Sequence, residues 1–318
     1  MHGLFSQLGK WVIAMVLIAS AGASAAADEA QRVGYRTRTI DGTNIFYREA
    51  GPPDAPVILM LHGFPTSSHM YRDVIPQLSQ RYHVIAPDYP GFGFSDVPSP
   101  QQFEYTFDHL ATVIERLTED LSLTRYAIFM QDFGGPVGLR LAEQHPDRVS
   151  ALIVQNAVAH EEGLSAALDP ARAYWASRNA ETEQPMRGLL TLDTTKFQYL
   201  QGAQDASRVS PDSWSHAQWL LDRPGNVEIQ LELLYDYRTN LKRYPSWQAY
   251  FRKHQPPTLI VWGKNDPFFT LEGAQAYQRD LPKAELHLLD AGHFAIEEHA
   301  SEIARLTIDF LDRQAGPR

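Results

Sequence analysis

The sequence contains no cysteine among its 318 residues, which excludes disulfide bonds, a thiolate nucleophile and a cysteine-type zinc site. It has no basic block either: 38 Asp and Glu outnumber 28 Lys and Arg, for a formal net charge of −10. A chain of this charge is not expected to bind nucleic acid or an anionic membrane surface. Internal repeats, phosphate-binding loops and histidines at metal-ligand spacing are also missing, so we expect no metal and no other cofactor.

The N-terminal segment has the pattern of a secretory signal peptide. Lys10 precedes an apolar run at residues 11–18, and the small-residue triplets A-S-A and A-A-A follow at 23–25 and 25–27. The alternative is a membrane anchor, but residues 11–27 are short for a span and rich in Ala, Gly and Ser. We therefore predict a signal peptide at 1–27, a secreted or periplasmic protein, and no stable membrane insertion after cleavage.

The rest of the chain alternates short apolar runs with longer helical patterns. A hairpin with a tight Asp-Gly turn is expected at residues 35–49. Six further strands follow, at 57–61, 83–86, 126–130, 151–155, 258–262 and 285–289. Residues 105–121 and 133–145 carry apolar side chains at three- and four-residue spacing, which is typical of helices. This order predicts an α/β fold with a mostly parallel eight-stranded sheet covered by helices on both faces.

The alternation is interrupted once. Residues 157–257 show no strand pattern, only helical sequence that is interrupted by prolines and holds four of the six tryptophans. We interpret this segment as a helical cap domain inserted into a core domain formed by residues 28–156 and 258–318. Its aromatic content fits a largely apolar pocket for a small, uncharged substrate, although it fits the hydrophobic core of the cap itself equally well. The oligomeric state is not indicated.

Chemically reactive residues follow several of the predicted strands. In a parallel sheet, ligands bind beyond the carboxyl ends of the strands. H-G-F-P follows the strand at 57–61, and Q-D-F-G-G follows the strand at 126–130. Asp266 and His293 follow the last two strands. The chain order is therefore Asp132, Asp266, His293.

At this point the sequence resembles the α/β-hydrolase family, from about residue 35 to 311. A predicted strand, the residues x-Asp-x-Gly-Gly and a predicted helix follow one another here, and this pattern matches the nucleophile elbow of that family. Asp132 stands where most members carry serine. The turn D-Y-P-G-F-G-F-S at 88–95 also matches. The glycines let the helix pack closely against the strand, and the backbone N–H groups of Phe64 and Phe133 are the expected oxyanion hole.

An aspartate at the elbow changes the expected reaction. Attack on an sp³ carbon gives an alkyl ester, which water then cleaves, whereas attack on an ester carbonyl gives an unproductive anhydride. We expect Asp132 to be the nucleophile, His293 to activate the water and Asp266 to orient His293. The competing interpretations are a helix N-cap for Asp132, a structural loop histidine for His293 and a turn residue for Asp266. Glu161 and Glu162 are rivals for the acid.

The resemblance extends to families that use an Asp nucleophile on epoxides or on carbon–halogen bonds. Epoxide hydrolases supply phenol O–H donors from the cap, whereas haloalkane dehalogenases supply N–H donors, usually from a tryptophan after the nucleophile. Phe133 stands at that position here. The segment D-Y-R-T-N at 236–240 looks like the cap motif that carries one ring-opening tyrosine, so Tyr237 is the first candidate and Tyr174 its partner, with Tyr199 and Tyr235 as rivals.

The same comparison leaves a halide substrate open. Gln131 before the nucleophile resembles one dehalogenase subfamily, in which a cap tryptophan such as Trp175 donates to the halide. We expect a hydrolase that forms an alkyl-enzyme ester, first an epoxide hydrolase and alternatively a haloalkane dehalogenase. Another α/β-hydrolase activity, or a binding protein with an idle triad, is the third possibility.

Overall fold

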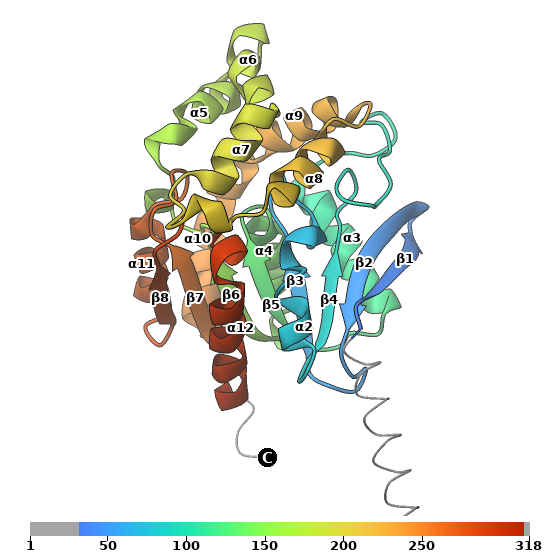
Figure 1. Ribbon diagram of the computed structural model, residues 1–318, viewed down its shortest axis with the longest axis vertical. Helices are drawn as coiled ribbons and strands as arrows, with labels where there is room; N and C mark the ends of the chain where they lie inside the picture. Colours follow the sequence, from blue (N-terminus) through green and yellow to red (C-terminus); the bar gives the residue numbers. More distant parts are fainter. Residues whose placement is uncertain (1–31, 315–318) are drawn as a thin grey trace, which may run out of the picture.

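A computed structural model describes residues 32–314 and contains one eight-stranded sheet (Figure 1). The strands are β1 (Gly34–Ile40), β2 (Thr43–Ala50), β3 (Val57–Leu61), β4 (His83–Pro87), β5 (Tyr126–Gln131), β6 (Val149–Gln155), β7 (Thr258–Gly263) and β8 (Glu285–Leu289). Their order across the sheet is 1-2-4-3-5-6-7-8, and only the β1–β2 and β2–β4 pairs are antiparallel. The predicted mostly parallel eight-stranded sheet is confirmed.

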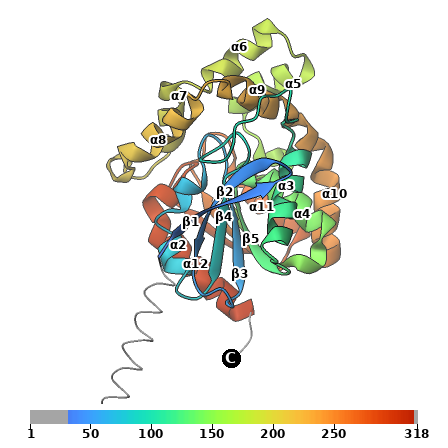
Figure 2. The same cartoon turned by 90° about the vertical axis from the view of Figure 1, so that its right-hand side faces the viewer.

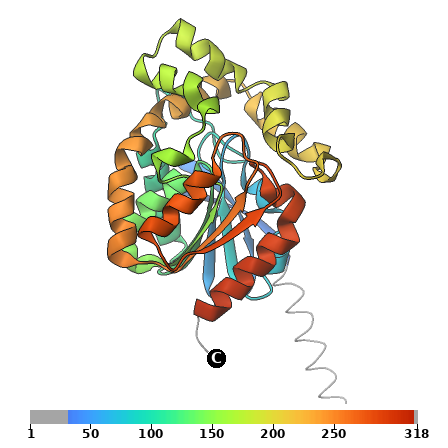
Figure 3. The same ribbon diagram turned by 90° about the vertical axis from the view of Figure 1, so that its left-hand side faces the viewer.

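Helices cover both faces of the sheet (Figure 3). One face carries α3 (Phe107–Asp120), α4 (Gly134–Gln144), α10 (Arg238–His254) and α11 (Leu271–Asp280), and the other carries α2 (Ile75–Leu78) and α12 (Ala295–Gln314). Because strand side chains alternate between faces, β5 sends Ile128 and Met130 into one hydrophobic core and Ala127 and Phe129 into the other. Burial on both faces explains why the strands read as continuous apolar runs.

Five helices between β6 and β7 lie above the carboxyl ends of the parallel strands (Figures 1 and 2), and we call them the roof. They are α5 (Asp169–Ala176), α6 (Ala180–Gly188), α7 (Leu192–Leu200), α8 (Pro211–Leu221) and α9 (Asn226–Asp236). Polar side chains cap the starts of two of them: Asn179 and Thr182 form a capping box on α6, and Ser210 caps α8. Helix α10, which the predicted cap segment 157–257 includes, packs beside the sheet against α4 and α11 instead.

Two half-buried arginines tie the roof to the core. Arg223 donates to the backbone carbonyls of Gly93 (2.8 Å) and Gly91 (3.2 Å). Arg72 donates to Glu297 at the start of α12 (2.7 Å) and to Ser213 in α8 (3.1 Å). These contacts fix the height of the roof over the strand ends.

The predicted signal peptide at 1–27 lies outside the described residues, so export of the protein stays a prediction. Within residues 32–314, no helix has the length and hydropathy needed to cross a bilayer.

Candidate active site

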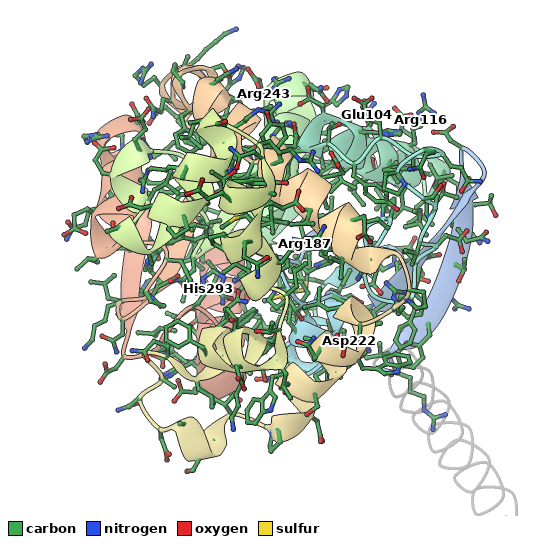
Figure 4. The ribbon with its side chains drawn as sticks, turned by 90° about the horizontal axis from the view of Figure 1, so that it is seen from above. Glu104, Arg116, Arg187, Asp222, Arg243 and His293 are labelled. Atoms are coloured by element: carbon green, nitrogen blue, oxygen red, sulfur yellow. The ribbon has the colours of Figure 1, made fainter. Side chains whose placement is uncertain are left out.

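Three side chains that are far apart in the sequence meet beneath the roof. Asp132 follows β5, Asp266 follows β7 and His293 follows β8. His293 Nδ1 lies 2.7 Å from Asp266 Oδ2, and His293 Nε2 lies 3.8 Å from Asp132 Oδ2. Seen from above, His293 lies inside the outline of the molecule, not at its rim (Figure 4). We call the loops after β3, β5, β7 and β8 the floor of the site.

The bend at Asp132 exposes its side chain at the floor. Asp132 has a φ of 49°, a left-handed conformation that costs energy for any residue other than glycine. The chain then turns at once into α4, which crosses β3 very closely. A Cβ atom on Gly134 would lie 2.0 Å from the carbonyl oxygen of Leu61, so only glycine fits there. The predicted role of these glycines in close packing is confirmed.

The Asp132 carboxyl is held by backbone donors. Its Oδ1 accepts from the N–H of Phe64 at 2.6 Å. Burial raises the pKa of Asp132, while His293 and the backbone N–H groups of Phe64 and Phe133 oppose this shift. Because Oδ1 is bound by the N–H of Phe64, Oδ2 is the oxygen that lies toward His293. The two predicted oxyanion-hole residues are thus both placed at Asp132.

His293 is buried between the two carboxylates. Burial lowers its pKa, but Asp266 and Asp132 more than offset this effect, so the pKa of His293 lies above the ordinary value of histidine. With its Nδ1 proton donated to Asp266, Nε2 is the atom that can accept a proton. The other Asp266 oxygen, Oδ1, accepts from the backbone N–H groups of Phe268 (2.8 Å) and Phe269 (3.1 Å).

Two further residues support this arrangement, and sequence analysis did not assign them a role. Asn156, with a φ of 41°, donates to Asp266 Oδ2 at 2.8 Å and accepts from the N–H of Gly263 at 2.9 Å. The amide Nε2 of Gln131 lies 3.0 Å from His293 Nε2. Asn156 follows β6 directly, so extending the search of strand ends to this strand would have found it.

The rival acids lie elsewhere. Glu162 is exposed and forms an ion pair with Arg279, and Glu161 is exposed as well. His62 is buried and accepts from the N–H of Tyr89 at 3.3 Å, which ties the loop after β3 to the loop after β4. Asp88 accepts from the backbone N–H groups of Ser68 and Phe94 and so holds the turn at 88–95.

A cavity opens between the floor and the roof. Asp132 and His293 lie at its base, and its walls are almost entirely apolar. The lining residues are Phe64, Asp132, Phe133, Ala167, Leu168, Pro170, Ala171, Trp175, Pro185, Met186, Leu189, Gln198, Leu234, Tyr237, Phe268, Phe269 and His293. Residues 32–314 contain no group of three or more His, Asp or Glu side chains arranged to hold a metal ion.

Of the predicted tyrosines, Tyr237 lines the cavity and Tyr174 does not. Tyr237 stands at the junction of α9 and α10, with its ring 5.9 Å from that of Phe133. Burial raises its pKa well above the ordinary value of tyrosine, so its O–H stays protonated. The assignment of Tyr174 as its partner is wrong for this structure, because the Tyr174 hydroxyl lies against Leu231 and Glu183 instead. Tyr199 and Tyr235 do not line the cavity either.

Trp175 lines the cavity, but its indole N–H is already used. It donates to the backbone carbonyl of Leu234 at 2.7 Å. Its ring stacks on Tyr237, with centroids 5.4 Å apart and planes 10° from parallel. Trp175 therefore supports Tyr237 and offers no free N–H to a ligand.

Comparison with known proteins agrees with this architecture. The model of the alpha/beta hydrolase fold family matches residues 56–300. An uncharacterized hydrolase of Saccharomyces cerevisiae is 38% identical over 281 residues, covering 87% of this chain and 96% of its own. A haloalkane dehalogenase of Psychrobacter cryohalolentis is 28% identical over 272 residues, covering 84% and 87%.

Among solved structures, haloalkane dehalogenase DbeA from Bradyrhizobium elkani superposes with a TM-score of 0.74 at 22% identity. The match covers 89% of this chain and 99% of that one, and it shows the shared fold. The strand order, the bend at Asp132 and the family match lead to one conclusion. The chain belongs to the α/β-hydrolase family and is related to haloalkane dehalogenases.

Proposed function

We propose that this hydrolase opens epoxides through a covalent ester on Asp132. The observation that carries the proposal is the position of Tyr237: it lines an apolar cavity whose base holds a buried carboxylate, and its high pKa keeps a proton on the phenol. An epoxide oxygen needs such a donor as the ring opens.

In the first step, Asp132 Oδ2 attacks one carbon of the epoxide and the carbon–oxygen bond of that carbon breaks. The ring oxygen takes the proton of the Tyr237 hydroxyl, and solvent later returns a proton to the phenolate. Oδ1 keeps its hydrogen bond to the N–H of Phe64 and becomes the carbonyl oxygen of the ester, and the N–H of Phe133 also bonds to this carboxyl group.

In the second step, His293 Nε2 takes a proton from water, and the hydroxide attacks the Asp132 carbonyl carbon. The N–H groups of Phe64 and Phe133 stabilise the oxyanion, a contribution of about 3 kcal/mol for each donor of this kind. Collapse releases the diol, which takes its proton from the His293 imidazolium. The Asp132 carboxyl then loses the remaining water proton to solvent, which balances the proton that solvent returns to Tyr237. Asp266 stabilises that imidazolium, and Asn156 holds Asp266 in place.

Ester formation also adjusts His293 for its role. The negative charge of Asp132 raises the pKa of His293 in the free enzyme. Alkylation removes that charge, so the pKa of His293 falls when the imidazole must be neutral to act as a base.

Carbon–halogen cleavage is the competing activity, and the related dehalogenases favour it. Two observations weigh against it. Phe133 has no side-chain N–H, and the N–H of Trp175 is bound to Leu234. A halide leaving the substrate would therefore lack both tryptophan donors at these positions.

The test uses His293→Ala, which should trap the ester. After exposure to styrene oxide, we expect the mass of Asp132-containing peptides to rise by the mass of the epoxide. In the otherwise wild-type enzyme, Tyr237→Phe should slow styrene oxide turnover by about 100-fold, the usual range for losing a general acid. 1,2-Dibromoethane serves as the halide comparison.

Tyr250→Phe is the matched control, because this tyrosine is also buried but does not line the cavity. It should leave turnover unchanged. Turnover of 1,2-dibromoethane without styrene oxide, unaffected by Tyr237→Phe, would replace the epoxide proposal with dehalogenation. Absence of any adduct and of any turnover would favour a binding protein with an idle triad.

A further inference from the structure

The roof carries one polar side chain in the cavity wall whose role the proposed reaction leaves open. Gln198, in α7, lines the cavity and is 5% exposed. Its Nε2 is buried and has no hydrogen-bond partner within residues 32–314. Buried amides are normally hydrogen-bonded, since an unpaired donor loses its water without compensation. A ligand in the cavity is the partner that this position makes available.

A neighbouring glutamine shows how the roof satisfies a buried amide that has a structural role. Gln218 in α8 is also buried, but its Nε2 donates to Leu190 (3.0 Å) and Asp222 (2.7 Å) and its Oε1 accepts from Thr195 (2.7 Å). Gln131, Gln155 and Gln230 have unpaired amide atoms too, yet none of them lines the cavity. The combination of an unpaired amide and a place in the wall is found, among the described glutamines, at Gln198.

Aromatic contacts on both sides of Gln198 fix its place above the site. Phe197 contacts Phe268, with ring centroids 6.2 Å apart, and Tyr199 stacks on Phe294 at 4.0 Å. Both of these phenylalanines contact the His293 ring. Gln198 is therefore held over the His293 side of the floor, whereas Tyr237 contacts Phe133.

We propose that Gln198 is a specificity-determining residue that donates a hydrogen bond to an oxygen acceptor of the substrate other than the epoxide oxygen. This inference rests on the proposed epoxide hydrolase activity. The substrate class is then an uncharged epoxide with an ether, carbonyl or hydroxyl oxygen on a short apolar chain. The terminal amide turns readily about its last torsion, so it can present Nε2 to the ligand. The wall offers no cation, so an anionic substituent would be left unpaired.

The experiment compares two substrates that differ by one atom: ethyl glycidyl ether and 1,2-epoxyhexane, in which a methylene replaces the ether oxygen. The quantity measured is the ratio of kcat/KM for the ether to kcat/KM for the alkyl epoxide. Gln198→Met keeps the length of the side chain and removes the donor. We expect it to lower the ratio about tenfold, the effect of one neutral hydrogen bond.

Gln201→Met is the matched control, because Gln201 is an exposed glutamine three residues further along that does not line the cavity. It should leave the ratio unchanged. An unchanged ratio in Gln198→Met, with both epoxides still turned over, would overturn the role of Gln198 while the epoxide hydrolase proposal stands.

Failure of the proposed activity gives a different result. If His293→Ala forms no adduct with either epoxide, the activity is wrong, and the role of Gln198 is decided by calorimetric dissociation constants for the same two compounds. Tighter binding of the ether that is lost in Gln198→Met supports the inference. Equal binding of both compounds, or an ether preference that survives in Gln198→Met, overturns it.

Discussion

The floor and the roof of the cavity differ in how their polar atoms are held. In the floor and at the adjoining Asn156, the Asp132 Oδ1, both Asp266 oxygens and the Asn156 amide have defined partners at 2.6–3.2 Å. In the roof, the cavity wall is apolar apart from Tyr237 and Gln198. Groups that are held in this way suit the bond-making steps, because misplacement of a reacting group is costly. A sparsely polar roof suits selection among substrates.

The largest effect is expected in the floor. Asp266→Asn should lower kcat by about 10³-fold, because the amide no longer stabilises the imidazolium and no longer fixes the tautomer of His293. The ester on Asp132 should accumulate, since the first step does not use His293. Single-turnover kinetics and the mass of the enzyme check both points.

Asp290→Asn provides the control for that variant. Asp290 lies three residues before His293, but it is half-exposed and bound to Lys264. Its loss should leave kcat within about twofold of wild type, as for other surface ion pairs. Equal losses in the two variants would show that the loop, and not the contact of Asp266 with His293, accounts for the effect.

A second comparison sets a floor glycine against a roof glycine. Gly134→Ala would place a Cβ atom 2.0 Å from the Leu61 carbonyl, so we expect it to lower the free energy of unfolding by about 2–3 kcal/mol. Gly188→Ala in α6 meets nothing within 4 Å and should raise it by about 0.5–1 kcal/mol, the helix-propensity gain. Urea unfolding measures both. Similar changes at the two positions would contradict the close crossing of α4 and β3.

The floor and the roof also differ in how much of each could be predicted from the sequence. The positions of the floor residues follow from local signals: apolar runs mark the strands, and the residues that follow them must meet at one edge. The structure brings Asp132, Asp266 and His293 together there, and their catalytic roles stay predictions. Gly134 lies two residues after the bend, so the elbow pattern marks it, although the close contact that it allows is with Leu61 in β3. The supporting residue Asn156 was missed although it obeys the same rule.

The roof was predicted less well, because helical periodicity does not tell which side chain faces the cavity. Tyr174 and Trp175 are adjacent, yet Trp175 lines the cavity while Tyr174 turns toward α9. That choice depends on how α5 packs against α9, which is a contact between segments about 60 residues apart in sequence. Gln198 carries no sequence signal at all, since its importance comes from lacking a partner.

The pH dependence of turnover is the smallest of the expected effects that distinguish the floor from the roof. Asp132 and His293 must be deprotonated for the proposed reaction, and the pKa of each lies above its ordinary value. Turnover should therefore fall as the pH decreases, approaching about tenfold per pH unit once the limiting group is protonated. Tyr237 must keep its proton to act as the acid, and burial holds the pKa of Tyr237 well above that of ordinary tyrosine. The profile of kcat from about pH 5 to 10 should thus have an acidic limb and no basic limb, because free tyrosine titrates near the upper end of that range.

Two variants separate the contributions to that profile. Tyr237→Phe should lower the rate without moving the acidic limb, since the protonated phenol carries no charge in that pH range. Asp266→Asn should move the limb to lower pH, because the Asp266 carboxylate is what raises the pKa of His293 against the effect of burial. A basic limb below about pH 10 that disappears in Tyr237→Phe would mean that the phenol ionises too easily, and the cavity would then be wetter than its apolar lining implies.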